Sequence, residues 1–237
     1  CCHCSSAGAI PIALTGLRGR MSGVAFFDLD RTLLGCNSAT LWVRRQVREG
    51  HMSRLSAGKM GVMIGLYQLG FGNVEESVNA AIRDLEGQLE ADIRQRTQVF
   101  WEEEVAHRFR PGAAEAISAH RAQGDRIVLL TGSSTYMSEC VAQVLPIDDA
   151  LCSTFDVVDG RFTGTGSVCY GPAKLVAAKA HLASSEITLS DCAFYTDSYT
   201  DLPVMLEVGR PVAVHPDPRL RRYAKRQGWP IQNWGEA

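Results

Sequence analysis

The feature that most constrains this chain is the stretch 25–34, AFFDLDRTLL, where an apolar run leads into two carboxylates at alternate positions and then a hydroxyl. Side chains along a strand alternate between its faces, so Asp28 and Asp30 are expected on one side and Leu29 on the other. Two like charges share a site when a cation or a proton compensates them, and hard divalent metals prefer carboxylate oxygens. The stretch therefore indicates a strand that ends at a metal site, which favours an enzyme over a binding module.

Length and composition limit the classes of protein that this chain can belong to. Its 237 residues suffice for one sizeable core, or for one domain that carries a smaller inserted one. With 46% hydrophobic and 21% charged residues, the chain has the composition of a soluble globular protein rather than of a disordered one. The net charge of −2 does not indicate a general basic surface, so we expect no nucleic-acid partner.

The cysteines and the N-terminal residues give information on the cellular compartment of the protein. The eight cysteines are mostly scattered through apolar contexts, which predicts free thiols in a reducing cytoplasm. Residues 1–20 form an extension of uncertain status, because the first methionine is Met21, and no Lys or Arg precedes the apolar residues 10–14 as in a secretory signal. The apolar segment 60–71 is too short to cross a bilayer. We expect a cytoplasmic protein, with membrane contact only if segment 60–71 is exposed.

A helical periodicity follows the first strand and continues to about residue 107. The apolar spacing and the supply of Glu, Arg, Gln and Ala predict four helices, over 38–49, 54–69, 74–85 and 90–109. We therefore expect an all-helical insert over residues 37–107.

From residue 110 onward, helices and strands alternate. The predicted helices span 112–123, 135–145, 172–182, 202–207 and 220–227. The predicted strands span 126–130, 192–195 and 211–214, and a hairpin over 155–158 and 161–163 surrounds the turn Asp159-Gly160. Such alternation predicts an α/β fold, a doubly wound parallel sheet covered on both faces, built from residues 21–36 and 108–237.

Polar residues stand where three of the predicted strands end. Asp28 and Asp30 follow the first strand, Thr131 follows the second, and Asp197 and Asp201 follow a third. Because open parallel sheets place their sites at the carboxyl ends of the strands, these side chains are expected at one edge.

These residues also carry a resemblance to a known family. In chain order they are Asp28-x-Asp30-x-Thr32, Thr131-Gly132, Lys174 and Asp197-Ser198-x-x-Asp201. This order is similar to the four motifs of the haloacid dehalogenase superfamily of phosphatases, and the helical block resembles the cap of its subfamily IB, the phosphoserine phosphatase-like branch. The resemblance implies a Rossmann-like core with an all-helical, C1-type cap inserted after the first strand. Arg31 departs from the pattern, since the family often has Gly there for turn geometry.

The resemblance implies which residue carries out each step of phosphoryl transfer. Asp28 would attack phosphorus and become an aspartyl-phosphate, and Asp30 would protonate the departing alcohol and then deprotonate the attacking water. Lys174 would screen the phosphate from Asp28. The hydroxyl of Thr131 and the amide of Gly132 would donate to phosphate oxygens.

The same resemblance implies a Mg²⁺ cofactor. Its ligands would be the Asp28 carboxylate, the backbone carbonyl of Asp30 and Asp197, with water and a phosphate oxygen completing the shell. Asp201 and Thr32 would orient these ligands without binding the metal themselves.

The predicted activity is hydrolysis of a small phosphorylated metabolite, of the phosphoserine or histidinol phosphate kind. Two alternatives stay open: a lipid-phosphate phosphatase that uses segment 60–71 at a membrane surface, and a non-hydrolysing phosphate-binding or scaffold protein with the same fold. A phosphotransferase is a milder variant of the enzyme. The helical insert should select the alcohol, and four cations in it are candidate contacts for an acidic substrate group, although solvation at the surface is the more ordinary role for each: Arg44, Arg45, Arg54 and Lys59.

Overall fold

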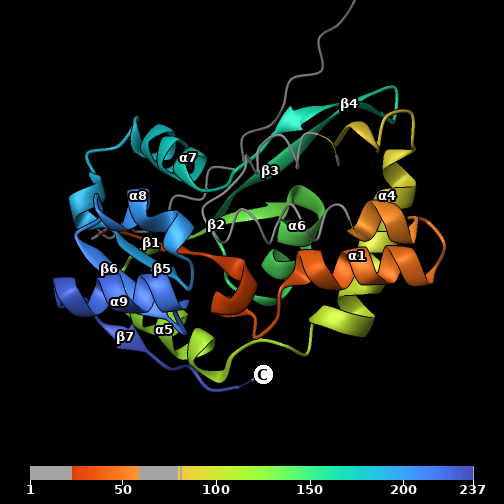
Figure 1. Ribbon diagram of the computed structural model, residues 1–237. Helices are drawn as coiled ribbons and strands as arrows, with labels where there is room; N and C mark the ends of the chain where they lie inside the picture. Colours follow the sequence, from red (N-terminus) through yellow and green to blue (C-terminus); the bar gives the residue numbers. More distant parts are fainter. Residues whose placement is uncertain (1–22, 59–79, 81, 237) are drawn as a thin grey trace, which may run out of the picture.

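The computed structural model describes residues 23–58, 80 and 82–236, and it has a seven-stranded sheet at its centre (Figure 1). The strand order is β4-β3-β2-β1-β5-β6-β7. The short strand β1 (Val24–Phe27) lies in the middle and pairs in parallel with β2 (Arg126–Ser134) on one side and β5 (Ala193–Thr196) on the other. All four residues of β1 are buried, as an apolar strand covered on both faces requires.

The outer strands complete the sheet. On the β5 side, β6 (Arg210–Val214) and β7 (Ile231–Gln232) continue the parallel pairing. On the β2 side, β3 (Asp149–Val158) is parallel and β4 (Arg161–Ser167) is antiparallel. Asp159 and Gly160 join these two strands with φ values of 50° and 72°, the backbone of the predicted two-residue turn. The α/β class with a mostly parallel sheet is confirmed.

Helices cover both faces of the sheet. They are α5 (Pro111–Ala122), α6 (Thr135–Val144), α7 (Pro172–Leu182), α8 (Leu202–Met205) and α9 (Pro218–Gln227). Ala25 and Phe27 pack with residues of α5 and α6, whereas Val24 and Phe26 pack with residues of α7, α8 and α9. The alternation of β1 thus separates two apolar layers, which is the doubly wound arrangement expected from the sequence.

Between β1 and β2 the described chain is helical. Helix α1 (Ser38–Arg48) begins after Asn37, whose side chain accepts a hydrogen bond from the Thr40 amide at 2.8 Å. Helix α4 (Glu90–Phe100) continues into a wider turn over Trp101–Val105 and packs on α1, with the rings of Trp42 and Phe100 5.3 Å apart. The helix expected over 90–109 is shorter than predicted, because α4 ends at Phe100 and the wider turn ends at Val105.

Several sequence predictions fall largely outside the described residues. These are the extension 1–20, the apolar segment 60–71 with Lys59, and most of the helices expected over 54–69 and 74–85, of which residues 54–58, 80 and 82–83 are helical. Within the part of the chain that the structure describes, none of the helices has both the length and the apolar character needed to cross a bilayer.

Gly209, directly before β6, lies close to the backbone of Ser190, and a substitution there can test the packing of the fold. A Cβ at Gly209 would lie 1.9 Å from the carbonyl oxygen of Ser190, while the Gly209 amide donates to Leu189 O at 3.0 Å. We expect Gly209→Ala to lower the free energy of unfolding by about 1–3 kcal/mol, measured by urea denaturation. The matched change Gly58→Ala meets no atom within 4 Å and should leave stability unchanged or raise it. Equal stability of the Gly209→Ala protein and the parent would contradict this packing.

Candidate active site

The central strand delivers its first carboxylate at its carboxyl end. Asp28 directly follows β1, and its amide donates to the carbonyl of Tyr195 on β5 at 2.9 Å. The chain then turns over Leu29–Leu33, where Arg31 has φ 61°, in the left-handed region that favours glycine. The Arg31 amide donates to Cys36 O at 2.9 Å, and the Arg110 guanidinium donates to the carbonyl of Arg31. These bonds hold the turn although Arg31 stands where the family pattern often has Gly.

A buried lysine joins two of the predicted carboxylates. Lys174 lies in the first turn of α7, and its Nζ donates to Asp28 Oδ1 and to Asp201 Oδ2, both at 2.7 Å. Lys174, Asp28 and Asp201 are 2%, 6% and 1% exposed, so these ion pairs are closed off from water. The cluster joins segments that lie 146 and 27 residues apart in the sequence.

Two hydroxyl groups hold the carboxylates in place. Thr32 Oγ1 accepts from the Asp197 amide at 3.0 Å and lies 3.4 Å from Asp28 Oδ2, so it connects the first and last motifs. Thr196 Oγ1 donates to Asp201 Oδ2 at 2.7 Å. Thr196 was not predicted as a site residue; the available signal was its position directly after the predicted strand 192–195 and directly before Asp197.

Asp30 has different partners from Asp28. Its Oδ1 accepts from the amide of Ser38 at 2.7 Å, at the start of α1, and its Oδ2 lies 3.4 Å from Ser133 Oγ. The alternation argument for Asp28 and Asp30 was wrong in its detail, because β1 ends at Phe27 and Asp30 belongs to the turn that follows. The two carboxylates are still near enough for the charge of Asp30 to act on Asp28.

The end of β2 lies beside the Asp30 carboxylate, which the Ser133 hydroxyl approaches to 3.4 Å. Thr131 is 1% exposed, and its Oγ1 accepts from the Ser133 amide at 3.1 Å. A Cβ at Gly132 would lie 3.0 Å from the ring of Tyr170, so a larger residue would disturb that packing. The cap of α6 is Ser134, whose Oγ accepts from Met137 N.

Burial dominates the electrostatics of the site. It raises the pKa of Asp28 to about 7, with further increases from Asp201 and Asp30 and an opposing effect of Lys174. Burial, with the charges of Asp28 and Asp201, holds the pKa of Asp197 well above its usual range. Burial also raises the pKa of Asp30, opposed by its hydrogen bonds to Ser38.

Burial acts on the pKa of Lys174 in the opposite direction from its effect on the carboxyl groups. Burial alone would lower the pKa of Lys174, but Asp201 and Asp28 outweigh it and raise that pKa, so the ammonium stays charged. Two carboxylates thus bind the ammonium, and its charge also acts on the carboxyl groups of Asp30 and Asp197. This excess of hard oxygen donors fits a divalent cation, and so does the Oδ1 atom of Asp201, which is buried with no hydrogen-bond partner. Among the described residues, no three His, Cys, Asp or Glu side chains form a ready-made metal cluster.

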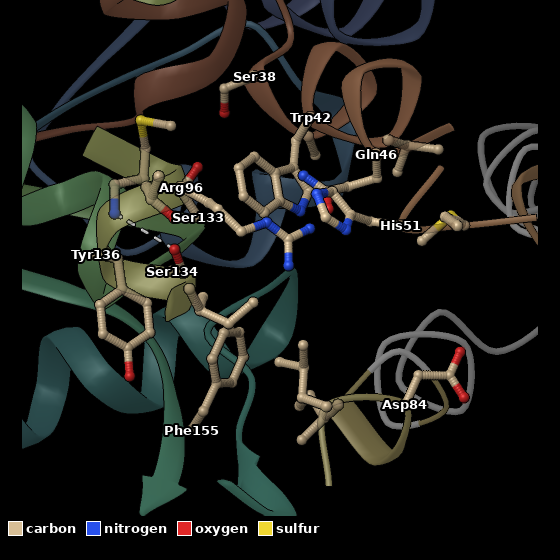
Figure 2. Close-up of a pocket in the computed structure, with 18 of the residues that line it drawn as sticks. Ser38, Trp42, Gln46, His51, Asp84, Arg96, Ser133, Ser134, Tyr136 and Phe155 are labelled. Atoms are coloured by element: carbon tan, nitrogen blue, oxygen red, sulfur yellow. Dashed lines mark hydrogen bonds between the residues drawn. The ribbon is translucent and has the colours of Figure 1, made fainter. Parts of the chain in front are cut away.

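A cavity of about 730 Å³ opens beside Asp30 (Figure 2). Ser38 and Ser133, which hydrogen-bond to the Asp30 carboxylate, line one part of it. Side chains of α1 and α4 line another part, among them Trp42 and Gln46 of α1 and Arg96 of α4. A group attached to a phosphate at Asp28 would therefore have room next to Asp30.

The cations expected to contact substrate do not line this cavity among the described residues. Arg45 is bound to Glu49, Glu103 and Glu104 at 2.7–3.2 Å, and Arg44 is exposed. Arg96, which lines the cavity, was not predicted as a contact. The signal was its place on α4 beside the buried positions Ile93, Thr97 and Phe100.

A family model described as haloacid dehalogenase-like hydrolase matches residues 25–206, which include every motif described above. The chain belongs to this family. The prediction of a haloacid dehalogenase-type enzyme, a hydrolase, is confirmed.

Named relatives agree with a phosphoric monoester hydrolase. This haloacid dehalogenase-like chain is 29% identical over 220 residues to a phosphoserine phosphatase of Mycobacterium tuberculosis, covering 90% of this chain and 71% of that protein. It is 25% identical over 221 residues to a histidinol-phosphatase of Neisseria meningitidis, covering 90% of this chain and all of that protein. A crystal structure of a Bordetella pertussis protein of unknown function has the same fold, with a TM-score of 0.81, 24% identity and coverage of 91% of this chain and all of that one.

The buried carboxylates predict a pH-dependent stability in the absence of metal. A carboxyl group whose pKa is raised by folding stabilises the protein below its unfolded pKa, about 3.9, and that stability is lost as pH rises through the folded pKa, about 7 for Asp28. In EDTA, we expect Tm to fall by several degrees between pH 6 and pH 8, measured by differential scanning fluorimetry.

Two variants isolate the contribution of Asp28. Asp28→Asn should reduce this pH dependence, whereas Glu186→Gln, at an exposed position, should leave it as in the parent. A Tm that rises over this pH range, with the same slope in Asp28→Asn, would contradict the burial of an ionisable cluster.

Proposed function

We propose that this haloacid dehalogenase-like protein is a Mg²⁺-dependent phosphomonoester hydrolase that works through an aspartyl-phosphate on Asp28. One observation carries the proposal: Asp28 lies at the carboxyl end of the central strand, bound to Lys174 at 2.7 Å, and near a cavity lined by Ser38 and Ser133, the hydrogen-bond partners of Asp30. Family membership supports the proposal, because the family model covers all the motifs from which the activity was predicted.

The first step is attack of the Asp28 carboxylate on phosphorus. The bond between phosphorus and the alcohol oxygen breaks as the bond to Asp28 forms, and the departing oxygen needs a proton. Lys174 favours the ionised carboxylate that this attack requires, offsetting part of the effect of burial on the pKa of Asp28. Thr131 and the amide of Gly132 would donate hydrogen bonds to the phosphoryl oxygens.

Asp30 supplies and recovers the proton. Its raised pKa favours the protonated acid, and its position beside the cavity suits transfer to the alcohol oxygen. Once ionised, Asp30 takes a proton from the water that attacks the aspartyl-phosphate. That attack breaks the bond between Asp28 and phosphorus, regenerates the carboxylate and releases phosphate.

The donor set fits Mg²⁺. Asp28, Asp197 and the backbone carbonyl of Asp30 would hold the ion, with Asp201 and Thr32 orienting the groups around it. A bound Mg²⁺ would offset the charge of the phosphoryl oxygens. This role is consistent with the excess of buried carboxyl groups over the ammonium of Lys174.

The helical insert, residues 37–107, would act as a cap that keeps water out and selects the alcohol. The names of the relatives support a small phosphorylated substrate, of the phosphoserine or histidinol phosphate kind. The lipid-phosphate alternative depends on segment 60–71, which lies outside the described residues, and the scaffold alternative does not explain an intact set of motif residues. Cytoplasmic location and the absence of a nucleic-acid partner stay predictions.

Hydrolysis of p-nitrophenyl phosphate tests this function. We expect release of p-nitrophenol with Mg²⁺ and its loss with excess EDTA. Asp28→Asn should lower kcat by about 10³-fold or more, because the amide is not a nucleophile. The matched change Asp159→Asn, in the hairpin turn, should leave the rate unchanged. Full activity of Asp28→Asn, or of the parent in EDTA, would contradict the proposed mechanism.

A further inference from the structure

A second, smaller cavity has a strongly cationic lining. It has a volume of about 160 Å³ and lies between α9 and the turn that follows β5. None of the proposed catalytic residues lines it. Three arginines and two tyrosines do: Arg219, Arg222, Arg226, Tyr199 and Tyr223. Sites for drug-sized ligands are about 300 Å³ or larger, so this cavity suits a single small anionic group.

The arginines of this cavity form no ion pair within the described part of the chain. The guanidinium of Arg219 lies over the ring of Tyr199, with its carbon 4.4 Å from the ring centre. Asp217, the acid directly before α9, is used as the helix cap. Its Oδ1 accepts from the amides of Arg219 and Leu220 at 2.7 and 2.9 Å, and its Oδ2 accepts from the amide of Tyr199 at 2.7 Å. The nearby carboxylate thus binds backbone amides rather than guanidinium groups.

The charge of α9 adds to this imbalance. The helix carries five cations and no acid: Arg219, Arg221, Arg222, Lys225 and Arg226. Arg219 lies in its first turn, where the helix dipole disfavours a cation. An anion in the cavity would offset both the repulsion among the arginines and this unfavourable placement.

We infer that the cavity binds a phosphoryl group, as inorganic phosphate or as part of a small phosphate ester, outside the active site. A guanidinium matches phosphate oxygens with a planar fork of donors, and the tyrosine hydroxyls add further donors. A phosphoryl group has three acceptor oxygens and close to two negative charges, whereas a carboxylate has two oxygens and one charge. Three arginines around one cavity therefore favour the phosphoryl group. The inference goes beyond the proposed function and does not depend on it.

The same helix disfavours a membrane or a nucleic acid as the occupant. Leu220 and Ala224 form its apolar face, and both are fully buried in the core, so no apolar face remains to enter a bilayer. With a net charge of −2, the chain does not indicate the extended basic surface that a nucleic-acid backbone requires. Arg221 and Lys225 are exposed on α9 but do not line the cavity, so they offer matched controls.

Nuclear magnetic resonance titration of the full chain tests the inference. The probes are inorganic phosphate and methylphosphonate, an analogue of a phosphate ester that is not hydrolysed, in about 150 mM sodium chloride. We expect saturable shifts of the backbone amides of Tyr199 and of α9, with a Kd of about 1 mM or less. Arg222→Gln and Arg226→Gln should each weaken this binding about tenfold, because each removes a charge-assisted contact. Tighter binding of methylphosphonate would favour an ester as the ligand, and tighter binding of phosphate would favour the free ion.

The control variants separate a site from a general attraction of anions. Arg221→Gln and Lys225→Gln should keep the Kd within about twofold, because their side chains lie outside the cavity. Equal losses in all four variants, or shifts that do not saturate by about 10 mM, would overturn the inference. Tighter binding of a single-stranded oligonucleotide that depends equally on all four cations would overturn it in favour of a nucleic acid.

The same titration separates this inference from the proposed function. Phosphate at the proposed active site should shift the amides of Gly132 and Lys174, in Arg222→Gln as in the parent. If the parent hydrolyses p-nitrophenyl phosphate but the α9 shifts do not saturate, the inference alone fails. If the parent hydrolyses no phosphomonoester, the proposed function fails, and the α9 shifts still decide the inference.

Discussion

The structure of the site depends on one buried ammonium, Lys174 Nζ, placed between the carboxylates of Asp28 and Asp201 at 2.7 Å each. Its three groups come from the end of β1, the first turn of α7 and the loop after β5, so the ion pairs form only when the sheet is assembled. Removal of one partner from a buried pair leaves an uncompensated charge and costs about 3–5 kcal/mol. The same pairing keeps Asp28 more acidic than burial alone would make it. The cluster therefore links the stability of the fold to the ionisation of the proposed nucleophile.

The parallel sheet explains why such a cluster arises at this edge. Carboxyl ends of neighbouring strands meet there, so β1, β2 and β5 deliver an acid, the proposed phosphate-binding backbone and a second pair of acids to one place. Thr32 connects the first and last of these segments through Asp197, and Ser133 connects the second to Asp30. The helices between β1 and β2 then add a cavity on the Asp30 side. In the proposed mechanism, proton transfer and selection of the alcohol therefore take place on the same side of the site.

Much of this arrangement follows from local sequence signals, and the remainder depends on contacts between distant residues. The buried strand before Asp28 and the Asp159-Gly160 turn are encoded by adjacent residues, and both were predicted. Strand β3 begins at Asp149, earlier than predicted, because its first residues pair with β2, which no local pattern reports. Strand β7 was missed because two residues carry no usable periodicity. The partners of Asp30 depend on a turn after β1, and Arg96 reaches the cavity wall only when α4 packs on α1.

The central claim is that Asp28 becomes phosphorylated during each turnover. The most direct test is rapid acid quenching of the Mg²⁺-loaded enzyme with a phosphomonoester, followed by peptide mass spectrometry to locate a bound phosphoryl group. The account predicts a transient phosphoryl group on Asp28 that forms and decays at least as fast as kcat, and none on Asp30 or Asp197. A phosphoryl group on another residue during turnover would contradict this mechanism. Turnover with no phosphorylated enzyme at any quench time, in an experiment where all enzyme molecules start the reaction together, would also contradict it.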